Sequence, residues 1–267
     1  MTAHGDRLGS VFDEAAAGYH QARPGYPEPL FDRLFDLLPS RPVLLEVGPG
    51  TGQATTPMLD RGARVTAVEL GPSLAAELRS RHVRAIADGH LDIEVGDFEH
   101  VPAAGARFHG VVSATAYHWI DRARQISRPA EVLCPGGRLA VIDTMQVSDP
   151  VDGGYFAAAD PIYARFGQTT STAAPTAATV TPEIVATMEA DMRCHDLTID
   201  RYLWHQTYDA ASYAALLRTY SGMLAMDRIR RDELIGELVA LVDDLGGSVT
   251  RPLVITLASC IVDASSA

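Results

Sequence analysis

The sequence predicts an α/β protein in which helices cover both faces of a largely parallel β-sheet. The first observation behind this prediction is that apolar runs of strand length alternate with helix-length segments from about residue 42 to residue 144. The second is that the first run, 42–47, breaks into glycines at alternate positions, as a strand does where a ligand lies at the carboxyl edge of such a sheet. With 267 residues, 47% of them hydrophobic, the chain is long enough for one sizeable domain of this kind with an insertion.

The first half of the chain supplies two leading helices and the alternating core. One helix is predicted over 8–22, and a second has an apolar stripe from Leu30 to Leu38 and ends at Pro39. Five strands then alternate with three helices. The strands are expected at 42–47, 64–69, 91–95, 108–115 and 137–143, and the helices at 52–61, 72–81 and 121–133.

The alternation fades after Thr144, and longer elements of mixed character follow. Two helices are expected on either side of a loop of small residues, and a helical stretch is expected between two last strands. The helices are predicted near 153–166 and 181–193, the loop at 169–176, the strands at 197–208 and 249–262, and the helical stretch at 209–245.

The composition restricts the classes of partner. The formal net charge is −12, which argues against a nucleic-acid partner because phosphate binding needs a basic surface. No apolar run has the length of a membrane helix, and residues 1–7 are polar, so we expect a cytoplasmic protein without a membrane partner. The three cysteines, Cys134, Cys194 and Cys260, show no metal-ligand spacing, and we expect no metal site.

The glycine loop after the first strand has the properties of a nucleotide-binding turn. Gly48, Gly50 and Gly52 let the backbone approach a ligand closely. The helix that follows offers unpaired N–H groups at its amino terminus. Glu69 closes the second strand roughly twenty residues later, which is the spacing at which an acid reaches a ribose hydroxyl.

The same loop departs from a dinucleotide-binding fingerprint. Its third glycine comes one place early, and Pro49 removes an N–H group that a pyrophosphate would use. The acidic residues Glu46, Glu69 and Asp97 suit hydroxyls, an amine and a cation, and they repel a pyrophosphate. The sequence contains no lysine, which removes the Tyr-x-x-x-Lys pair of a nicotinamide oxidoreductase. These features favour S-adenosylmethionine (SAM) as the cofactor.

Four segments in order carry a resemblance to a known family, namely 46–52, 65–70, 95–98 and 133–139. With them the chain resembles the class I SAM-dependent methyltransferases, from about residue 8 to about residue 145 and more weakly to the end. The resemblance implies a Rossmann-like, seven-stranded mixed sheet whose last strand is antiparallel, with a helical lid over its carboxyl edge. The parts expected on this basis are an N-terminal helical cover (1–40), a SAM-binding core (41–145), helical lid insertions (146–196 and 209–246) and the last two strands of the core (197–208 and 247–263).

The resemblance also implies which residues bind the cofactor. The first segment supplies the glycine loop, the second supplies the acid for the ribose, and the third supplies an aspartate that faces the adenine amino group. The N-terminal segment folds over the cofactor in similar enzymes. The residues expected to bind SAM, or its product S-adenosylhomocysteine (SAH), are Tyr19, Arg23, Glu46, Gly48, Pro49, Gly50, Thr51, Gly52, Glu69, Leu70, Asp97, Phe98, Ala114 and Thr115.

The end of the fourth strand is expected to face the transferred methyl group. His118 is the candidate general base there, because a histidine with an ordinary pKa titrates near neutrality. The alternative is that His118 and Trp119 only form a wall of the cofactor pocket. The acceptor is expected to contact Tyr26, Trp119, Tyr155 and Tyr220.

The function that these features predict is methyl transfer from SAM to a small molecule. The run from Arg23 to Pro27 and the His118–Trp119 pair resemble a subgroup of small-molecule methyltransferases similar to trans-aconitate methyltransferase. A secondary metabolite or a small carboxylic acid is the expected acceptor, and a monomer or a homodimer is the expected assembly. The alternatives are a protein that binds SAM without transferring the methyl group, or a SAM-dependent enzyme of another reaction type.

Overall fold

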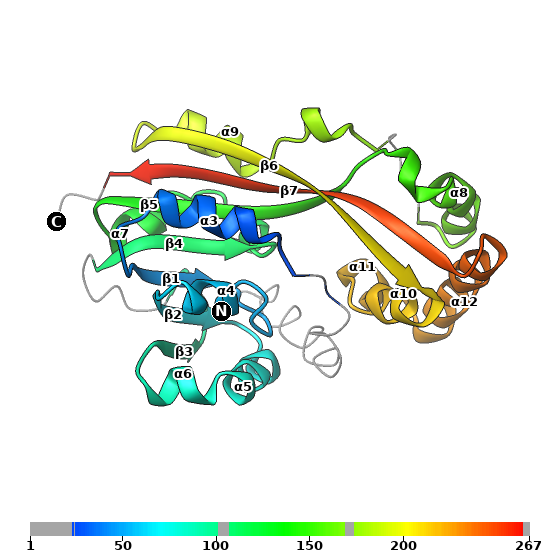
Figure 1. Cartoon of the computed structure of the whole chain (residues 1–267), viewed down its shortest axis with the longest axis horizontal. Coiled ribbons are helices and arrows are strands. Elements are labelled where there is room, and N and C mark those ends of the chain that lie inside the picture. Colours follow the sequence, from blue (N-terminus) through cyan, green and yellow to red (C-terminus); the bar gives the residue numbers. More distant parts are fainter. Residues whose placement is uncertain (1–22, 24, 101–106, 169–173, 264–267) are drawn as a thin grey trace. The chain divides into compact units, whose positions relative to one another are not determined.

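The computed structural model describes residues 23, 25–100, 107–168 and 174–263 (Figure 1). The helix predicted over 8–22, with Tyr19, lies outside the described residues. The chain divides into two compact units. One, which we call the core unit, contains Gly25–Thr144, Thr181–Tyr202 and the residues from Ile255 onward; the other, the helical unit, contains Met145–Val180 and Leu203–Val254 together with Arg23.

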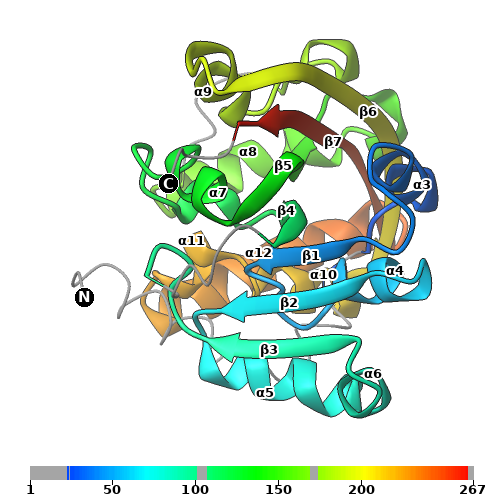
Figure 2. The ribbon, with the colours of Figure 1, turned by 90° about the vertical axis from the view of Figure 1, so that its left-hand side faces the viewer.

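The central structure is a seven-stranded sheet with the strand order β3-β2-β1-β4-β5-β7-β6. The pairs β1–β2, β2–β3, β1–β4 and β4–β5 are all parallel, and Figure 2 shows β1, β2 and β3 running in the same direction. β1 therefore lies at the point where the strand order reverses, which is where this kind of sheet binds its ligands. The strands are β1 (Val43–Val47), β2 (Arg64–Glu69), β3 (Leu91–Val95), β4 (Phe108–Ala114), β5 (Leu133–Gln146), β6 (Cys194–Asp209) and β7 (Ser248–Val262).

The last strand runs against its neighbour. The Asp263 N–H donates to the Arg193 carbonyl at 2.9 Å, and the hydroxyls of Thr207 and Thr250 lie 2.9 Å apart. Since the partner's number falls as the residue number rises, β7 is antiparallel to β6, as their arrowheads in Figure 1 also show. The seven-stranded mixed sheet with helices predicted from the sequence is therefore confirmed.

The helices follow the predicted pattern, with one informative difference at the glycine loop. The helix predicted at 72–81 is confirmed as α5. The helix predicted from residue 52 begins only at Thr55, because Gly52 has a φ of 99°, which a right-handed helix does not accommodate. The helices are α3 (Glu28–Asp36), α4 (Thr55–Asp60), α5 (Pro72–Arg81), α6 (Val83–Ala87), α7 (Ser127–Val132), α8 (Tyr155–Arg165), α9 (Ile184–Ala190), α10 (Ala210–Leu217), α11 (Ser221–Leu224) and α12 (Arg228–Asp244).

The core unit is held by apolar side chains that connect the sheet to α7 and α9. Ile184 and Met188 of α9 belong to the same buried cluster as Leu139 and Val141 of β5. Burial of such side chains stabilises the packing by about 1.5–3 kcal/mol each. This apolar face explains why residues 181–202 belong to the core unit, although the sequence-based boundaries counted 181–196 with the insertion.

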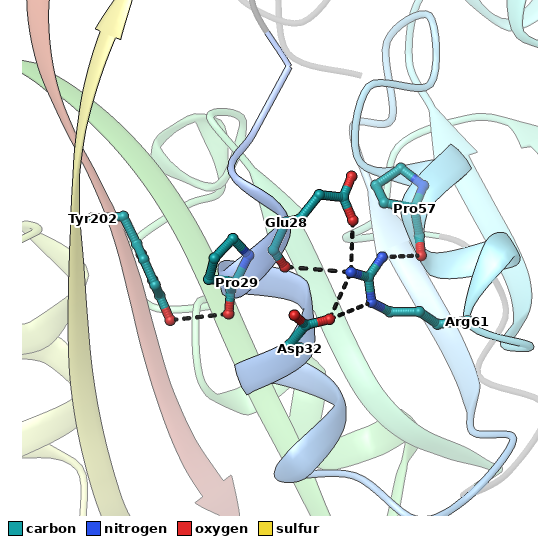
Figure 3. A network of polar contacts seen from close by, with 6 residues as sticks. All are labelled: Glu28, Pro29, Asp32, Pro57, Arg61 and Tyr202. Atoms are coloured by element: carbon teal, nitrogen blue, oxygen red, sulfur yellow. Dashed lines mark hydrogen bonds and ion pairs between the residues drawn. The ribbon is translucent and has the colours of Figure 1, made fainter.

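A polar network connects α3 to the end of α4 within the core unit (Figure 3). Arg61, just after α4, donates from Nη2 to Glu28 Oε2 and to Asp32 Oδ1, each at 2.7 Å. The Tyr202 hydroxyl on β6 donates to the Pro29 carbonyl at 3.4 Å. The network attaches α3 to the helix that directly follows the glycine loop.

The helical unit has its own apolar core, in which α8, α10 and α12 pack together. Two aspartates set where its helices begin: Asp209 accepts the N–H of Ser212 at 2.7 Å, and Asp227 accepts the N–H of Ile229 at 3.0 Å. Such caps satisfy N–H groups that the helix itself leaves unpaired. None of the helices in the described part of the chain is long and apolar enough to cross a membrane.

Candidate cofactor site

The glycine loop between β1 and α4 is left-handed at each of its glycines. Gly48, Gly50 and Gly52 have φ values of 65°, 58° and 99°. A Cβ atom on Gly48 would lie 2.5 Å from Cβ of Ala116, and one on Gly52 would lie 2.7 Å from Cε1 of His82. The loop therefore fits between the end of β4 and the end of α5 only without side chains at these positions.

Glu69, the last residue of β2, lies directly against this loop. Its Oε2 accepts the N–H of Gly50 at 2.9 Å, and its Oε1 accepts the N–H of Gly71 at 2.8 Å. The residue is only 6% exposed. Glu69 therefore fixes the loop to the start of α5, and its carboxylate lies beside the backbone that would hold a nucleoside. A loop with glycines at alternate positions and an acid beside it fits a cofactor that carries a ribose.

Glu46 lies beneath the loop and differs from Glu69 in its charge. It is 1% exposed, and the Thr55 hydroxyl donates to its Oε2 at 2.7 Å. Burial raises the pKa of Glu46 to about 8, against the opposing effect of the Thr55 hydrogen bond and with a further increase from the negative charge of Glu69. Glu46 is therefore mostly protonated at neutral pH, and the negative charge at the loop comes from Glu69.

We expect Glu46 to make the protein less stable as the pH rises from about 4.5 to about 8. The native state keeps a proton in this range that the unfolded chain releases at its ordinary pKa of 4.5. The contribution of Glu46 to the free energy of unfolding is largest below pH 4.5. Between pH 4.5 and about 8 this contribution falls by at most about 1.4 kcal/mol for each pH unit. The free energy of unfolding of the wild type and of Glu46→Gln can be measured with urea at pH 5, 6, 7 and 8. As the pH rises, the wild type should lose stability relative to the variant. A difference in unfolding free energy between the two proteins that stays constant across that range would contradict the buried, protonated state of Glu46.

The end of β4 meets the loop from the other side. Thr115, directly after this strand, has a φ of 55°, and its N–H donates to the Ile142 carbonyl at 2.8 Å. The hydroxyls of Tyr26 and Thr115 lie 3.3 Å apart. Together with the Gly48–Ala116 contact, this brings Tyr26, the glycine loop and the end of β4 to one place in the core unit.

His118 and Trp119 follow on a short 3₁₀ helix, Tyr117–Trp119. Their ring centroids are 4.6 Å apart, and both side chains are exposed. Asp143 on β5 interacts electrostatically with His118: burial raises the pKa of Asp143, and the charge of His118 opposes this increase. Sequence reasoning missed Asp143, although its place after the apolar run of β5 puts it at the same sheet edge.

The segment 95–98 contains two predicted cofactor-binding residues, of which Asp97 is partly exposed and Phe98 is buried. Asp97 accepts the N–H of Glu99 at Oδ1, at 2.9 Å, and lies with Oδ2 2.8 Å from Nδ1 of His100. Its side chain is 43% exposed. Phe98 is buried in the apolar cluster of the core unit. Asp97 is thus accessible to an adenine amino group, whereas Phe98 supports the turn from within.

Three predicted site residues belong to the helical unit. Arg23 donates from Nε to the Thr219 hydroxyl at 2.9 Å, and its guanidinium lies 4.9 Å from the ring centre of Tyr220. Tyr155 is buried, and its hydroxyl donates to the Leu238 carbonyl at 3.1 Å. The remaining described candidates lie in the core unit: Tyr26, Glu46, Gly48, Pro49, Gly50, Thr51, Gly52, Glu69, Leu70, Asp97, Phe98, Ala114, Thr115, His118 and Trp119.

Two comparisons of the sequence identify the domain that carries this loop. Residues 45–141 match the sequence model of the methyltransferase domain family. An uncharacterised methyltransferase of Mycobacterium tuberculosis is 34% identical over 142 residues, which are 53% of this chain and 55% of the relative. The biotin biosynthesis bifunctional protein BioHC of Cellvibrio japonicus is 33% identical over 143 residues, which are 52% of this chain and 27% of that protein. The chain thus spans about half the length of the mycobacterial relative that it matches.

Solved structures share the fold at low sequence identity. Phosphoethanolamine N-methyltransferase 2 of Haemonchus contortus superimposes with a TM-score of 0.55 at 14% identity. The match includes 94% of this chain and 57% of the Haemonchus chain. The YcgJ protein of Bacillus subtilis superimposes with a TM-score of 0.52 at 16% identity. The match includes 88% of this chain and 98% of the YcgJ chain.

Residues 45–141 therefore have the sequence of a methyltransferase domain. The glycine loop, the carboxylate of Glu69 beside it and the seven-stranded mixed sheet are consistent with the class I SAM-dependent methyltransferase fold. SAM, the cofactor predicted from the sequence, is confirmed as the cofactor of this class. Among the described residues, no group of three or more His, Cys, Asp or Glu side chains is arranged to hold a metal ion.

Proposed function

We propose that this protein transfers a methyl group from SAM to a small-molecule acceptor. The observation that supports this most strongly is the left-handed glycine loop fixed by the carboxylate of Glu69 at the reversal point of the sheet. The loop backbone, Glu69 and Asp97 would hold the ribose and the adenine of the cofactor. When bound, SAM supplies a methyl group on a positively charged sulfur.

The chain's own contribution to such a reaction is alignment and, for some acceptors, removal of a proton. In-line displacement from a sulfonium needs the nucleophile to be oriented and water to be excluded. His118 would accept the proton of an acceptor hydroxyl or amine at one ring nitrogen. The carboxyl group of Asp143 interacts with the charge that His118 then carries.

Several finer features belong to the same proposal. The acceptor is a secondary metabolite or a small carboxylic acid, in line with the resemblance to trans-aconitate methyltransferase-like proteins. The protein acts in the cytoplasm as a monomer or a homodimer. Arg23 and Tyr220 of the helical unit contribute to ligand binding.

Calorimetric titration with SAH, followed by incubation with methyl-labelled SAM and a panel of small acceptors, tests the proposal. Heat of SAH binding together with label in an acceptor is the expected result. Binding without label in any acceptor would favour a SAM-binding protein that does not methylate. Absence of SAH binding to well-folded protein would refute the proposed function.

We expect Glu69→Ala to weaken SAH binding by about 1–3 kcal/mol, because it removes a charged acceptor from the ribose and frees the loop from α5. Calorimetry on the wild type and the variant measures this change. Glu77→Ala, on the exposed side of α5, serves as the matched control and should leave the affinity unchanged. Equal affinities for all three proteins would place the ribose elsewhere.

A further inference from the structure

The helical unit contains a partly buried arginine whose hydrogen-bond partners are neutral. Arg251 on β7 donates from Nε and Nη2 to Gln146 Oε1, at 3.3 and 2.9 Å. Its Nη1 donates to the Tyr220 hydroxyl. Neither an amide oxygen nor a phenol hydroxyl neutralises a guanidinium, so these bonds position the charge without balancing it.

The other strong neighbours of Arg251 are also tyrosines. The four groups that act most strongly on its charge are Tyr220, Tyr213, Tyr208 and Tyr163. Burial raises the pKa of Tyr163 and that of Tyr213 well above the ordinary value, so these phenols stay neutral at physiological pH. A cation among neutral groups is costly when it is removed from water, and this cost falls when an anion binds beside it.

A second guanidinium shares the same aromatic ring. Cζ of Arg23 lies 4.9 Å from the centroid of the Tyr220 ring, and Cζ of Arg251 lies 5.6 Å from it. Arg23 is held there by two bonds to Thr219, from Nε to the hydroxyl at 2.9 Å and from Nη2 to the carbonyl at 3.0 Å. An anion bound beside this ring would therefore lie close to both guanidinium groups and be attracted by each.

A buried hydroxyl in the same cluster has no hydrogen-bond partner among the described residues. Tyr208 is 7% exposed, and its OH group donates to and accepts from none of them. Arg251 and Arg23 are both among the charges that act on this phenol. A buried polar atom without a partner costs about 1–3 kcal/mol, and a ligand with acceptor oxygens at this place would satisfy it.

We propose that Arg251, Arg23 and the Tyr208 hydroxyl form a binding site for a small carboxylate that carries an aromatic or apolar body. The guanidinium groups would bind the carboxylate oxygens, the phenol would donate to one of them, and the tyrosine rings would contact the body of the ligand. A phosphate ester carries more charge and suits these aromatic walls less well. The role of this carboxylate as the methyl acceptor rests on the proposed function. Its binding to the site does not depend on that function.

The test uses calorimetry on the full chain with three probes, benzoate, phenylacetate and cinnamate, each beside its neutral amide. At least one carboxylate should bind, and its amide should bind at least about tenfold more weakly. Arg251→Gln should raise the Kd of that carboxylate at least about tenfold, whereas Arg251→Lys should raise it less. Tyr208→Phe, which removes only the unpaired hydroxyl, should raise it about threefold or more. These fold-changes correspond to the range expected for one charge-assisted or neutral hydrogen bond.

Arg165→Gln is the matched control, because Arg165 lies on the helical unit's surface and pairs with Glu237. It should leave carboxylate binding unchanged, and circular dichroism should show the native fold for every variant used. Binding of no carboxylate, equal binding of acids and amides, or equal binding by wild type and Arg251→Gln would overturn the proposal. If Arg251→Gln does not fold, Arg251→Lys and Tyr208→Phe decide in its place, and unchanged binding by both is the refuting result.

Two further titrations separate the sources of failure. Inorganic phosphate that binds more tightly than every carboxylate, with the same loss in Arg251→Gln, would overturn the assignment to a carboxylate. SAH titration of the same proteins reports on the proposed function alone. Carboxylate binding without SAH binding would support the carboxylate site and refute the methyltransferase proposal. SAH binding without carboxylate binding would refute the carboxylate site and leave the methyltransferase proposal unaffected.

Discussion

Replacement of Gly50 by aspartate is expected to abolish cofactor binding. The residue has a φ of 58°, and its N–H is bound by the carboxylate of Glu69. An aspartate side chain would place a second negative charge beside Glu69 and fill the space that the cofactor needs. We expect the Kd for SAH, measured by calorimetry, to rise at least about 100-fold, which corresponds to about 2.7 kcal/mol.

The matched control for this change is Gly89→Asp. Gly89 is also left-handed, with a φ of 70°, but apart from Gly89 itself and its two chain neighbours no residue has an atom within 4 Å of the position where its Cβ would stand. Gly89→Asp should lower the thermal stability, as any side chain at a left-handed position does, but it should bind SAH with the affinity of the wild type. If Gly50→Asp retained wild-type affinity, the loop would not be the cofactor site.

Removal of the His118 imidazole is expected to reduce turnover far more than cofactor affinity. A positioned general base contributes about 10²- to 10⁴-fold to a rate. His118→Ala should therefore lower kcat by that order with an acceptor found by labelling, while the Kd for SAH stays within about twofold of the wild type. Asp143→Asn should lower kcat less and alter its pH profile, since Asp143 interacts with the charge on His118.

The alternative role of His118 predicts another pattern. If His118 and Trp119 only form a wall, His118→Ala should weaken SAH binding and turnover in parallel. His90→Ala, at an exposed histidine before β3, should change neither quantity. The ratio of the two losses therefore distinguishes a base from a wall.

Much of the core unit could be predicted because its signals are local. The strands at 64–69 and 91–95 and the helix at 72–81 agree with the structure to the residue, since apolar periodicity and Pro72 define them within a short window. The spacing of Glu69 after the glycines predicts an acid within reach of a ribose, and in the structure this last residue of β2 lies beside the loop. Parallel strands that end at one edge make such spacing a reliable guide.

The features that sequence reasoning missed depend on contacts between distant positions. Arg251 meets Gln146, which is 105 positions earlier, and no pattern along the chain connects the two. Asp143 is informative only once β5 is known to lie beside β4. The charge of Glu46 was also beyond the sequence, because burial, rather than residue type, decides whether that carboxyl group ionises.

The division of the chain has a consequence for grafting acceptor specificity between enzymes. Three boundaries between the units fall inside strands: inside β5 after Thr144, inside β6 after Tyr202 and inside β7 after Val254. The helical unit therefore cannot be exchanged as one block, because a chimera would have to exchange two separate stretches, 145–180 and 203–254, and rejoin three strands within the sheet. Recombination libraries that swap one contiguous block would break a strand at every crossover of this kind.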